Sequence, residues 1–311
     1  MLVKYGGTQT NQQDQYVVLT KMNGLIIING YTKYLSSINQ ANRLVEEFKL
    51  LNVDVEIKKS TDIIYYYSNN KYIVDLPKYD FVIYLDKDKY LSRILFDNGY
   101  RLFNSPQSIE DCDDKMITHI KLSKHHIPMP NTIGAPLCYC ESNDYSFLDK
   151  VIEQINFPIV VKECYGSKGE QIYLAKNKEQ LINIENKLRY KPHLYQQFIS
   201  PGGEDYRLIL INHQVVAMMK RKNDNDFRSN IALGGEGISV DLPKSFTDLA
   251  IQVSYILDLD YCGIDLLKDE FNNPLVCEVN SNAFFEGIEK ATKVNVAKKY
   301  CEFIISKINN I

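Results

Sequence analysis

The first part of the chain alternates between apolar runs and segments with apolar residues at helical spacing. The apolar runs predict strands at 24–30, 53–59 and 81–86, whereas the spacing over 36–52 predicts a helix. A second helix and a short strand complete this pattern. Strands and helices that follow one another in this order predict an α/β domain over residues 23–105.

The middle of the chain has a different order of elements. The segment 105–126 predicts one long helix, which the prolines of IPMP end. An apolar strand at 157–163, a glycine-bearing turn, a helix at 177–189 and a strand at 193–199 follow. We expect these elements to form a central lobe over residues 106–200.

The last segment predicts antiparallel strands with flanking helices. A strand pair is expected over 205–222, a second pair at 263–269 and 274–280, and a helix at 290–308. The glycine-rich SPGGE before the first of these strands predicts a linker. We therefore expect a C-terminal α+β lobe over residues 201–311.

Composition narrows the classes of function. The chain has 311 residues, 45% of them hydrophobic and 24% charged, which suits two or three globular domains preceded by a polar N-terminal extension, residues 1–22. A net charge of −3 gives no basic field, so no nucleic-acid partner is expected. No apolar run is long enough for a membrane span and no signal-peptide pattern is present, so we expect a cytoplasmic protein without membrane association.

The stretch VCEVNSN near the C-terminus places acidic and amide side chains on one predicted strand. Alternation predicts that Glu278 and Asn280 share one face while Cys277 and Val279 share the other. Asp265, on the other strand of the predicted hairpin, could converge with the first pair. Three oxygen donors suit a hard cation such as Mg²⁺. A solvated face with incidental acids is the alternative interpretation.

Lys162 ends the apolar strand FPIVVK, where a partly buried ammonium group needs an anionic partner. The loop GSKG at 166–169 follows, and its backbone N–H groups could surround phosphate oxygens. An ordinary hairpin turn is the alternative. Neither GxxxxGK[ST] nor GxGxxG after a strand occurs in the chain, so these two nucleotide-binding motifs are absent.

The run KRKNDNDFRSN at 220–230 interleaves basic residues with aspartates. Charged runs of this kind are usually solvated loops. Arg228 is followed by Ser229 and Asn230, however, and a planar guanidinium beside neutral hydrogen-bonding groups suits the recognition of phosphate oxygens. Both interpretations stay open on these residues alone.

The separate motifs occur in a fixed order, which is FPIVVK, GSKG, YQQFI, DYR, DFRSN, GGEG, GIDLL, CEVN and EGIEKAT. In this order and spacing they resemble the ATP-grasp ligases, most closely the RimK-like branch, which adds amino acids such as glutamate to a carboxylate. The likeness runs from about residue 104 to the C-terminus. Residues 23–105 resemble the N-terminal α/β domain of that family in position and type. The resemblance implies the ATP-grasp fold, in which ATP is held between two α+β lobes.

The resemblance also implies roles for the matching residues. The implied nucleotide-binding residues are Lys115, Lys162, Gly166, Ser167, Lys168, Gly169, Gln197, Phe198, Ile199, Glu204, Asp205, Arg228, Ser229 and Asn230. Within this set the two lysines would contact the α- and β-phosphates, and either Asp205 or Glu204 would bind the ribose. The implied Mg²⁺ ligands are Asp265, Glu278 and Asn280.

The activity implied by the resemblance is phosphoryl transfer from ATP to a carboxylate, followed by attack of an amine on the acyl phosphate to form an amide. The catalytic groups would be Lys162, Arg221 and Arg228. The cofactors would be ATP and magnesium, with two ions expected and manganese as an alternative. The expected partners are a small-molecule or peptide carboxylate and an amino acid, and a homo-oligomer is compatible with the sequence. A thiol or other acceptor, or a nucleotide-binding regulatory protein without turnover, is the alternative function.

Two departures from the family pattern concern the substrate. The family's ASPGLEG becomes SNAFFEG here, which places Asn282, Phe284 and Phe285 where small residues and proline would be. The family's LHRGG becomes IALGG, which lacks both basic residues. We therefore expect an incoming amine that is less anionic than glutamate.

Overall fold

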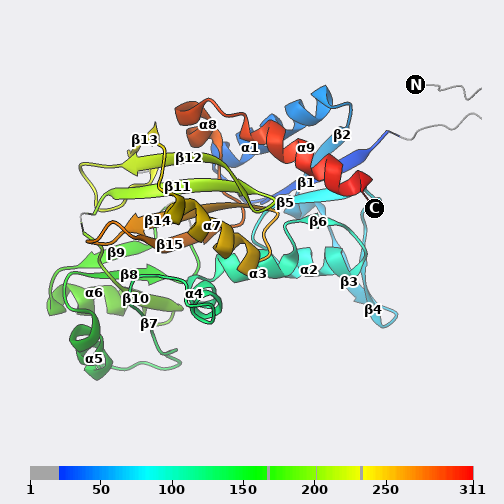
Figure 1. The fold of residues 1–311 in the computed structure, drawn as a ribbon. Coiled ribbons are helices and arrows are strands. Elements are labelled where there is room, and N and C mark those ends of the chain that lie inside the picture. Colours follow the sequence, from blue (N-terminus) through cyan, green and yellow to red (C-terminus); the bar gives the residue numbers. More distant parts are fainter. Residues whose placement is uncertain (1–20, 167–168, 201, 232–233, 311) are drawn as a thin grey trace, which may run out of the picture.

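The computed structural model describes residues 21–166, 169–200, 202–231 and 234–310. Nearly all of the predicted N-terminal extension lies outside these ranges, as do Ser167 and Lys168 of the glycine loop. In Figure 1 the N-terminal sheet lies at the right, and the sheets of the C-terminal and central segments lie one above the other at the left. None of the described helices is long and apolar enough to cross a bilayer.

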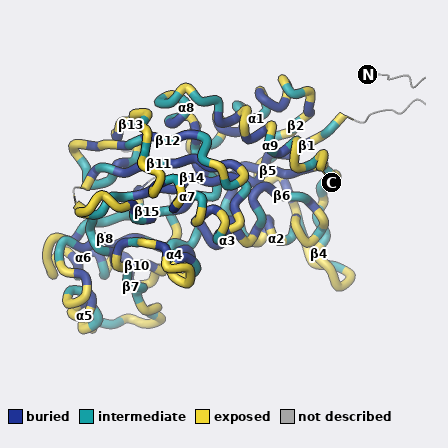
Figure 2. Tube along the Cα trace, viewed as in Figure 1, coloured by how far each residue is buried: buried dark blue, intermediate teal, exposed yellow. Residues whose placement is uncertain are grey.

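The N-terminal sheet is parallel throughout, in the order β2-β1-β5-β6. Its strands are β1 (Asn23–Ile28), β2 (Asp54–Lys59), β5 (Phe81–Leu85) and β6 (Leu102–Phe103). The central strands β1 and β5 are continuous apolar runs because α1 (Leu35–Leu50) and α2 (Lys89–Asp97) cover opposite faces of the sheet (Figure 2). The predicted α/β architecture of this region is confirmed.

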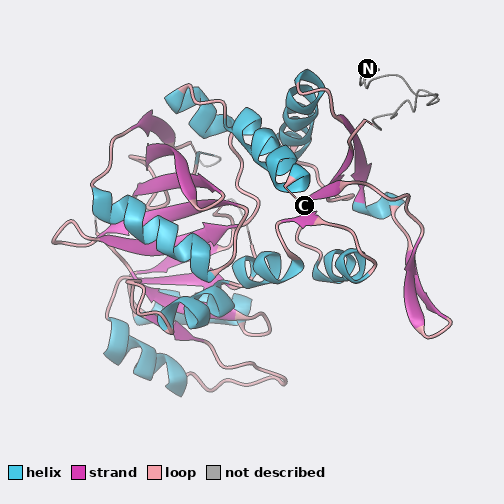
Figure 3. Ribbon diagram, turned by 45° about the vertical axis from the view of Figure 1, so that its right-hand side comes forward, coloured by secondary structure: helices cyan, strands magenta, loops and turns pink. Residues whose placement is uncertain are grey.

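A two-stranded hairpin of β3 (Tyr65–Ser68) and β4 (Lys71–Val74) follows a short 3-10 helix, η1 (Ser60–Asp62), and was not predicted. It projects from the N-terminal domain (Figures 1 and 3). The turn residues Asn69 and Asn70 have φ of 50° and 61°, as a two-residue turn between twisted strands requires. The Asn-Asn pair was therefore an available signal.

The central sheet is antiparallel, in the order β7-β10-β8-β9. Its strands are β7 (Thr132–Gly134), β8 (Ile159–Glu163), β9 (Ile172–Ala175) and β10 (His193–Gln197). The helices α5 (Ser146–Ile155) and α6 (Lys178–Leu188) pack their apolar sides against the same buried cluster as the sheet. Lys162 therefore stands on a strand that is fixed by a packed core on one side.

The predicted helix at 105–126 is in fact two helices, α3 (Pro106–Asp113) and α4 (Lys115–Ser123). Asp114 between them has extended backbone angles, with φ −90° and ψ 106°, and its carboxylate accepts hydrogen bonds from the first turn of α4. Local side-chain capping competes with helix continuation at aspartate, which explains the break. The break places Lys115 at the start of α4.

The C-terminal sheet is antiparallel, in the order β13-β12-β11-β14-β15. Its strands are β11 (Glu204–Ile211), β12 (Gln214–Lys222), β13 (Glu236–Ser239), β14 (Tyr261–Lys268) and β15 (Pro274–Asn280). The short β13 was not predicted. The helix α7 (Lys244–Ile256) covers one face, and the predicted helix at 290–308 is divided into α8 (Glu286–Thr292) and α9 (Val296–Asn309). Lys293, with φ 62°, ends α8.

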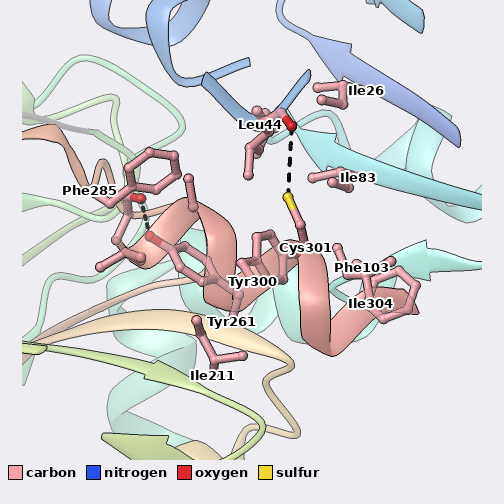
Figure 4. Close-up of a cluster of buried hydrophobic side chains, with 14 of the residues drawn as sticks. Ile26, Leu44, Ile83, Phe103, Ile211, Tyr261, Phe285, Tyr300, Cys301 and Ile304 are labelled. Atoms are coloured by element: carbon pink, nitrogen blue, oxygen red, sulfur yellow. Dashed lines mark hydrogen bonds between the residues drawn. The ribbon is translucent and has the colours of Figure 1, made fainter. Parts of the chain in front are cut away.

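The C-terminal helix α9 joins the N-terminal domain to the C-terminal sheet. Figure 4 shows Cys301 of α9 beside Leu44 of α1, with Cys301 Sγ 3.8 Å from the Leu44 carbonyl oxygen. On the other side, Tyr300 packs against Tyr261 of β14, with ring centroids 4.7 Å apart. These residues form one buried cluster, so the C-terminal helix fixes the N-terminal domain against the C-terminal sheet.

Candidate active site

A cleft lies between the central and C-terminal sheets. Its walls come from β8 and β9 on one side and from β11, β12, β14 and β15 on the other. The predicted site residues that line it are Lys162, Phe198, Ile199, Glu204, Asp205, Arg221, Arg228, Ser229, Asn230, Asp265 and Glu278. The structure therefore brings together most of the residues that the motifs marked, although they span more than a hundred positions.

One end of the cleft is strongly charged. Lys162 is 5% exposed, and its Nζ lies 3.7 Å from Cys277 Sγ. Lys115 Nζ lies 3.4 Å from Glu278 Oε1 and 3.4 Å from the carbonyl oxygen of Gly166. Burial opposes ionisation of Glu278, but the two ammonium groups lower its pKa overall. Positive charge therefore gathers around an ionised carboxylate beside the glycine loop.

A β-bulge at Cys277 shapes this end of the cleft. Asp265 on β14 pairs with Glu278 on β15, but the next pair of the ladder skips Cys277. Val276 and Val279 are buried in the core, whereas Cys277 and Glu278 both line the cleft. The prediction that Cys277 and Val279 share a face is therefore wrong, because the extra residue interrupts the alternation of the strand.

Two arginines hold Asp265. Arg207 donates from Nε to Oδ1 at 2.7 Å and from Nη2 to Oδ2 at 2.6 Å. Arg221 Nη2 lies 2.8 Å from the same Oδ2, and its guanidinium also binds both carboxylate oxygens of Asp205. Burial opposes the charge on Asp265, but the two guanidinium groups hold its pKa well below the usual range. Asp265 is therefore a fixed anion.

The two acids predicted for ribose differ in their surroundings. The side chain of Asp205 is 9% exposed and is fully engaged by Arg221. The side chain of Glu204 is 26% exposed, with Oε2 2.7 Å from Lys220 Nζ and Oε1 accepting from Tyr206 Oη at 2.8 Å. Glu204 is thus the more accessible carboxylate of the two.

The predicted metal ligands are only partly brought together. Asp265 and Glu278 face each other across the ladder, whereas Asn280 pairs with Gly263 and is not among the residues that line the cleft. Over the residues that the structure describes, no group of three or more acidic, histidine or cysteine side chains is arranged to hold a metal. Magnesium, however, is commonly held by one or two carboxylates together with phosphate oxygens. The pair on β14 and β15 fits that donor set.

Arg228 contacts the far end of the glycine loop. Its Nη1 donates to the carbonyl oxygen of Gly169 at 2.7 Å, while its Nε and Nη2 bind the Asp226 carboxylate at 2.9 and 2.7 Å. Lys115 holds the near end of the same loop at Gly166. Both described ends of the loop are therefore bound by side chains predicted to contact phosphates.

The segment between the two lobes forms the inner wall of the cleft. Phe198 and Ile199 line it, whereas Gln197 belongs to β10 and its backbone N–H donates to Asn131 O at 2.8 Å. Gly203 has φ +80°, and a Cβ there would lie 2.4 Å from the carbonyl oxygen of Asn223. Only glycine fits this turn, which holds the linker against the loop that precedes Arg228.

Two basic residues near the charged end of the cleft were not predicted from the sequence. Arg207 follows Asp205 by two positions on β11, so strand alternation alone places both on one face, and that signal was available. Lys87 comes from the N-terminal domain, and no motif marked it. Its Nζ lies 2.6 Å from Asp113 Oδ1 and 3.5 Å from the carbonyl oxygen of Gly166.

Phe285 does not line the cleft. It is 2% exposed and belongs to the buried cluster around Tyr261 and Tyr300 (Figure 4). The expectation that this ring reshapes the substrate pocket is wrong, because it fills the junction between the N-terminal domain and the C-terminal sheet. Residues 232–233 of the IALGG motif lie outside the described residues.

Comparisons with known proteins agree with this geometry. A family model described as a RimK-like ATP-grasp domain matches residues 112–304. Human N-acetylaspartylglutamate synthase A is 35% identical over 228 residues, which are 72% of this chain and 57% of the relative. A probable alpha-L-glutamate ligase of Legionella pneumophila is 32% identical over 218 residues, 68% of this chain and 70% of the relative. The chain thus spans little more than half the length of the human protein.

A solved structure with the same fold is the ATP-grasp ligase PsnB, complexed with a phosphomimetic variant of its minimal precursor, Mg and ADP. It matches with a TM-score of 0.67 at 15% identity and covers 92% of this chain and 99% of that chain. At this identity the match concerns the fold alone. The predicted ATP-grasp fold is confirmed.

Proposed function

Because the chain belongs to the RimK-like ATP-grasp family, we propose that it is an ATP-dependent ligase that joins a carboxylate to an amine. The observation that carries the proposal is the meeting of Lys115 and Lys162 with Glu278 and Asp265 at one end of the cleft. Cations for phosphate oxygens and carboxylates for magnesium lie side by side there. A metal-bound polyphosphate requires both.

In the proposed reaction an oxygen of the carboxylate substrate attacks the γ-phosphorus of ATP, and the bond to the β-phosphate oxygen breaks. ADP leaves and an acyl phosphate forms. The amine nitrogen then attacks the acyl carbon, the bond from carbon to the phosphate oxygen breaks, and the nitrogen loses a proton as the amide forms. No side-chain nucleophile is needed, so the protein supplies position and charge neutralisation.

Different residues of the cleft would bind different parts of the nucleotide. Phe198 and Ile199 would contact the purine, and Glu204, as the more accessible acid, would bind the ribose. Lys115 and Lys162 would contact the phosphates. Bound magnesium would supply further neutralisation of the phosphate oxygens.

Asp265 and Glu278 would hold the magnesium. We propose two ions, with manganese as a substitute, because hard oxygen donors accept either metal. Of the two arginines predicted to be catalytic, Arg228 is assigned to the transferred phosphoryl group, since it contacts the glycine loop. Arg221 is assigned to holding the two aspartates in place.

Glutamate is the first amine to test, because the names of both relatives contain it. Neutral amino acids form the second set, since the IALGG motif lacks the basic residues of the family pattern. The buried position of Phe285 weakens the other reason for expecting a less anionic amine, which then rests on Asn282 and Phe284.

The proposal is tested with purified protein, Mg-ATP, a panel of small carboxylic acids, and hydroxylamine as a general amine. We expect ADP formation that depends on one class of acid, together with the matching hydroxamate. Glu278→Gln should abolish both products, because the carboxylate lies beside Lys115. Glu270→Gln, an exposed change in the turn of the same hairpin, is the matched control and should leave them unchanged.

ADP formation that no acid stimulates would contradict the ligase and favour a different acceptor. Full turnover in Glu278→Gln would contradict the assigned site. Tight ATP binding without any turnover would favour a regulatory protein. Far-ultraviolet circular dichroism of each variant shows whether the fold is retained.

A further inference from the structure

The topology of the N-terminal sheet marks a binding position that the nucleotide cleft does not include. From β1 the chain passes through α1 to β2 on one side, and from β5 it passes through α2 to β6 on the other side. The connections therefore leave in opposite directions from two adjacent strands. In open parallel sheets ligands bind outside the carboxyl ends of the strands at such a point.

The residues at this point are held in a defined arrangement. Asn29 follows β1, and Asp86 and Lys87 follow β5. Asn29 Nδ2 donates to Asp86 Oδ1 at 3.0 Å, and the backbone N–H of Lys87 donates to the same oxygen at 2.7 Å. Asp86 is 6% exposed, so its carboxylate ties the two strand ends together and fixes the direction in which Lys87 leaves the sheet.

The side chain of Lys87 reaches from this point to the charged end of the cleft. Its Nζ lies 3.5 Å from the carbonyl oxygen of Gly166, the same oxygen that Lys115 Nζ approaches at 3.4 Å. Lys87 therefore belongs to the same electrostatic site as the residues assigned to the phosphates, although it comes from another domain.

A second contact joins the N-terminal domain to this loop region. The hydroxyl of Tyr34, the residue before α1, donates to Glu170 Oε1 at 3.0 Å. The segment after β1 thus contacts Glu170, just beyond the glycine loop. The segment after β5 contacts Gly166, in the glycine loop itself. The carboxyl ends of β1 and β5 therefore lie next to the loop that Lys115 also contacts.

We propose that Lys87 binds the carboxylate of the acid substrate, an inference that rests on the proposed ligase function. The attacking carboxylate oxygen and the γ-phosphoryl group are both negatively charged, and a cation between them lowers their repulsion. As the new oxygen–phosphorus bond forms and the bond to ADP breaks, the ammonium group stays beside the acyl phosphate. Lys87 thereby gives the N-terminal domain a direct part in selecting the acid.

The ion pair between Lys87 and Asp113 supports this role. The side chain of Lys87 is 39% exposed, and that of Asp113 is 17% exposed. A partly exposed ion pair contributes little stability and exchanges easily with a second carboxylate. Asp113 thus holds the ammonium group at the strand ends without burying it.

Lys87→Met tests the inference, because methionine keeps the unbranched stem and removes the charge. With the acid that supports hydroxamate formation in the wild type, we expect KM for the acid to rise roughly tenfold or more, as for the loss of a charged hydrogen bond. KM for ATP should stay within about twofold, since the other phosphate contacts remain. Lys87→Arg should restore part of the affinity for the acid.

Lys89→Met is the matched control, two residues further on at the partly exposed start of α2. It should leave both KM values unchanged. An unchanged KM for the acid in Lys87→Met, or an equal rise in both KM values, would overturn the inference and make Lys87 a support of the glycine loop.

Failure of the proposed function is visible separately, as a wild-type protein that forms no hydroxamate with any acid. In that case, thermal shift measures the binding of the same acids in the presence of a non-hydrolysable ATP analogue and magnesium. This binding then decides the role of Lys87. Stabilisation by an acid in the wild type that is lost in Lys87→Met supports the inference. Absence of stabilisation by every acid, or stabilisation that Lys87→Met retains, overturns it.

Discussion

Arg221 and Arg228 belong to the same charged run, yet the structure gives them different surroundings. Arg221 on β12 is 2% exposed and binds the buried carboxylates of Asp205 and Asp265. Arg228 lies beyond the end of that strand and binds Asp226 together with the carbonyl oxygen of Gly169. One guanidinium neutralises buried charge within the sheet, and the other reaches the loop beside the cleft.

Residue type and motif position therefore do not decide whether an arginine can act on a substrate. A guanidinium whose partners are two buried carboxylates cannot leave them without exposing uncompensated charge. A guanidinium with one carboxylate partner and a loop contact can exchange the loop contact for a phosphate oxygen. We therefore expect removal of Arg221 to act on stability and removal of Arg228 to act on turnover.

The largest effect on stability is expected for Arg221→Met. Loss of the guanidinium leaves Asp205 buried without its cation, and breaking a buried ion pair in this way costs about 3–5 kcal/mol. Urea unfolding followed by circular dichroism measures the change. Arg93→Met, which removes an exposed ion pair with Glu110, is the matched control and should cost less than about 1 kcal/mol. Equal effects in the two variants would refute the contrast.

Acid should weaken the same network to a smaller extent. The folded-state pKa of Asp265 lies below its unfolded value, so its contribution to stability is complete above about pH 4 and is lost as the pH falls further. Asp265→Asn removes this titration. We expect the difference in unfolding free energy between the wild type and Asp265→Asn to shrink by about 1 kcal/mol from pH 6 to pH 3, since much of the contribution is lost only below pH 3. A difference that stays constant with pH would contradict the fixed anion.

The smallest effect on stability is expected for Arg228→Ala, within about 1 kcal/mol, because its ion pair with Asp226 is partly exposed. Turnover should nevertheless fall at least about tenfold, since the variant loses a cation beside the transferred phosphoryl group. Lys222→Ala, which removes an exposed ion pair with Asp224 nearby, serves as the control. Stable protein with undiminished kcat would show that Arg228 does not contact the reacting group.

The spacing of apolar residues along the chain predicted most of the strands and helices, and with them the architecture. The apolar runs of β1 and β5 are strands because both faces are covered, and the hairpin predicted from 263–269 and 274–280 placed Asp265 beside Glu278. These features depend on neighbouring residues, so the sequence contains them directly. The ordered motifs likewise marked most of the residues that line the cleft.

Other features depend on residues that are distant along the chain, so they follow only from how the elements pack against one another. The bulge at Cys277 depends on how β15 pairs with β14, and the burial of Phe285 depends on how α9 docks against α1. Lys87 reaches the glycine loop only because the N-terminal sheet is packed beside the cleft. Local periodicity fixes which face a side chain takes within its own element, whereas the partner on that face is set by packing between elements.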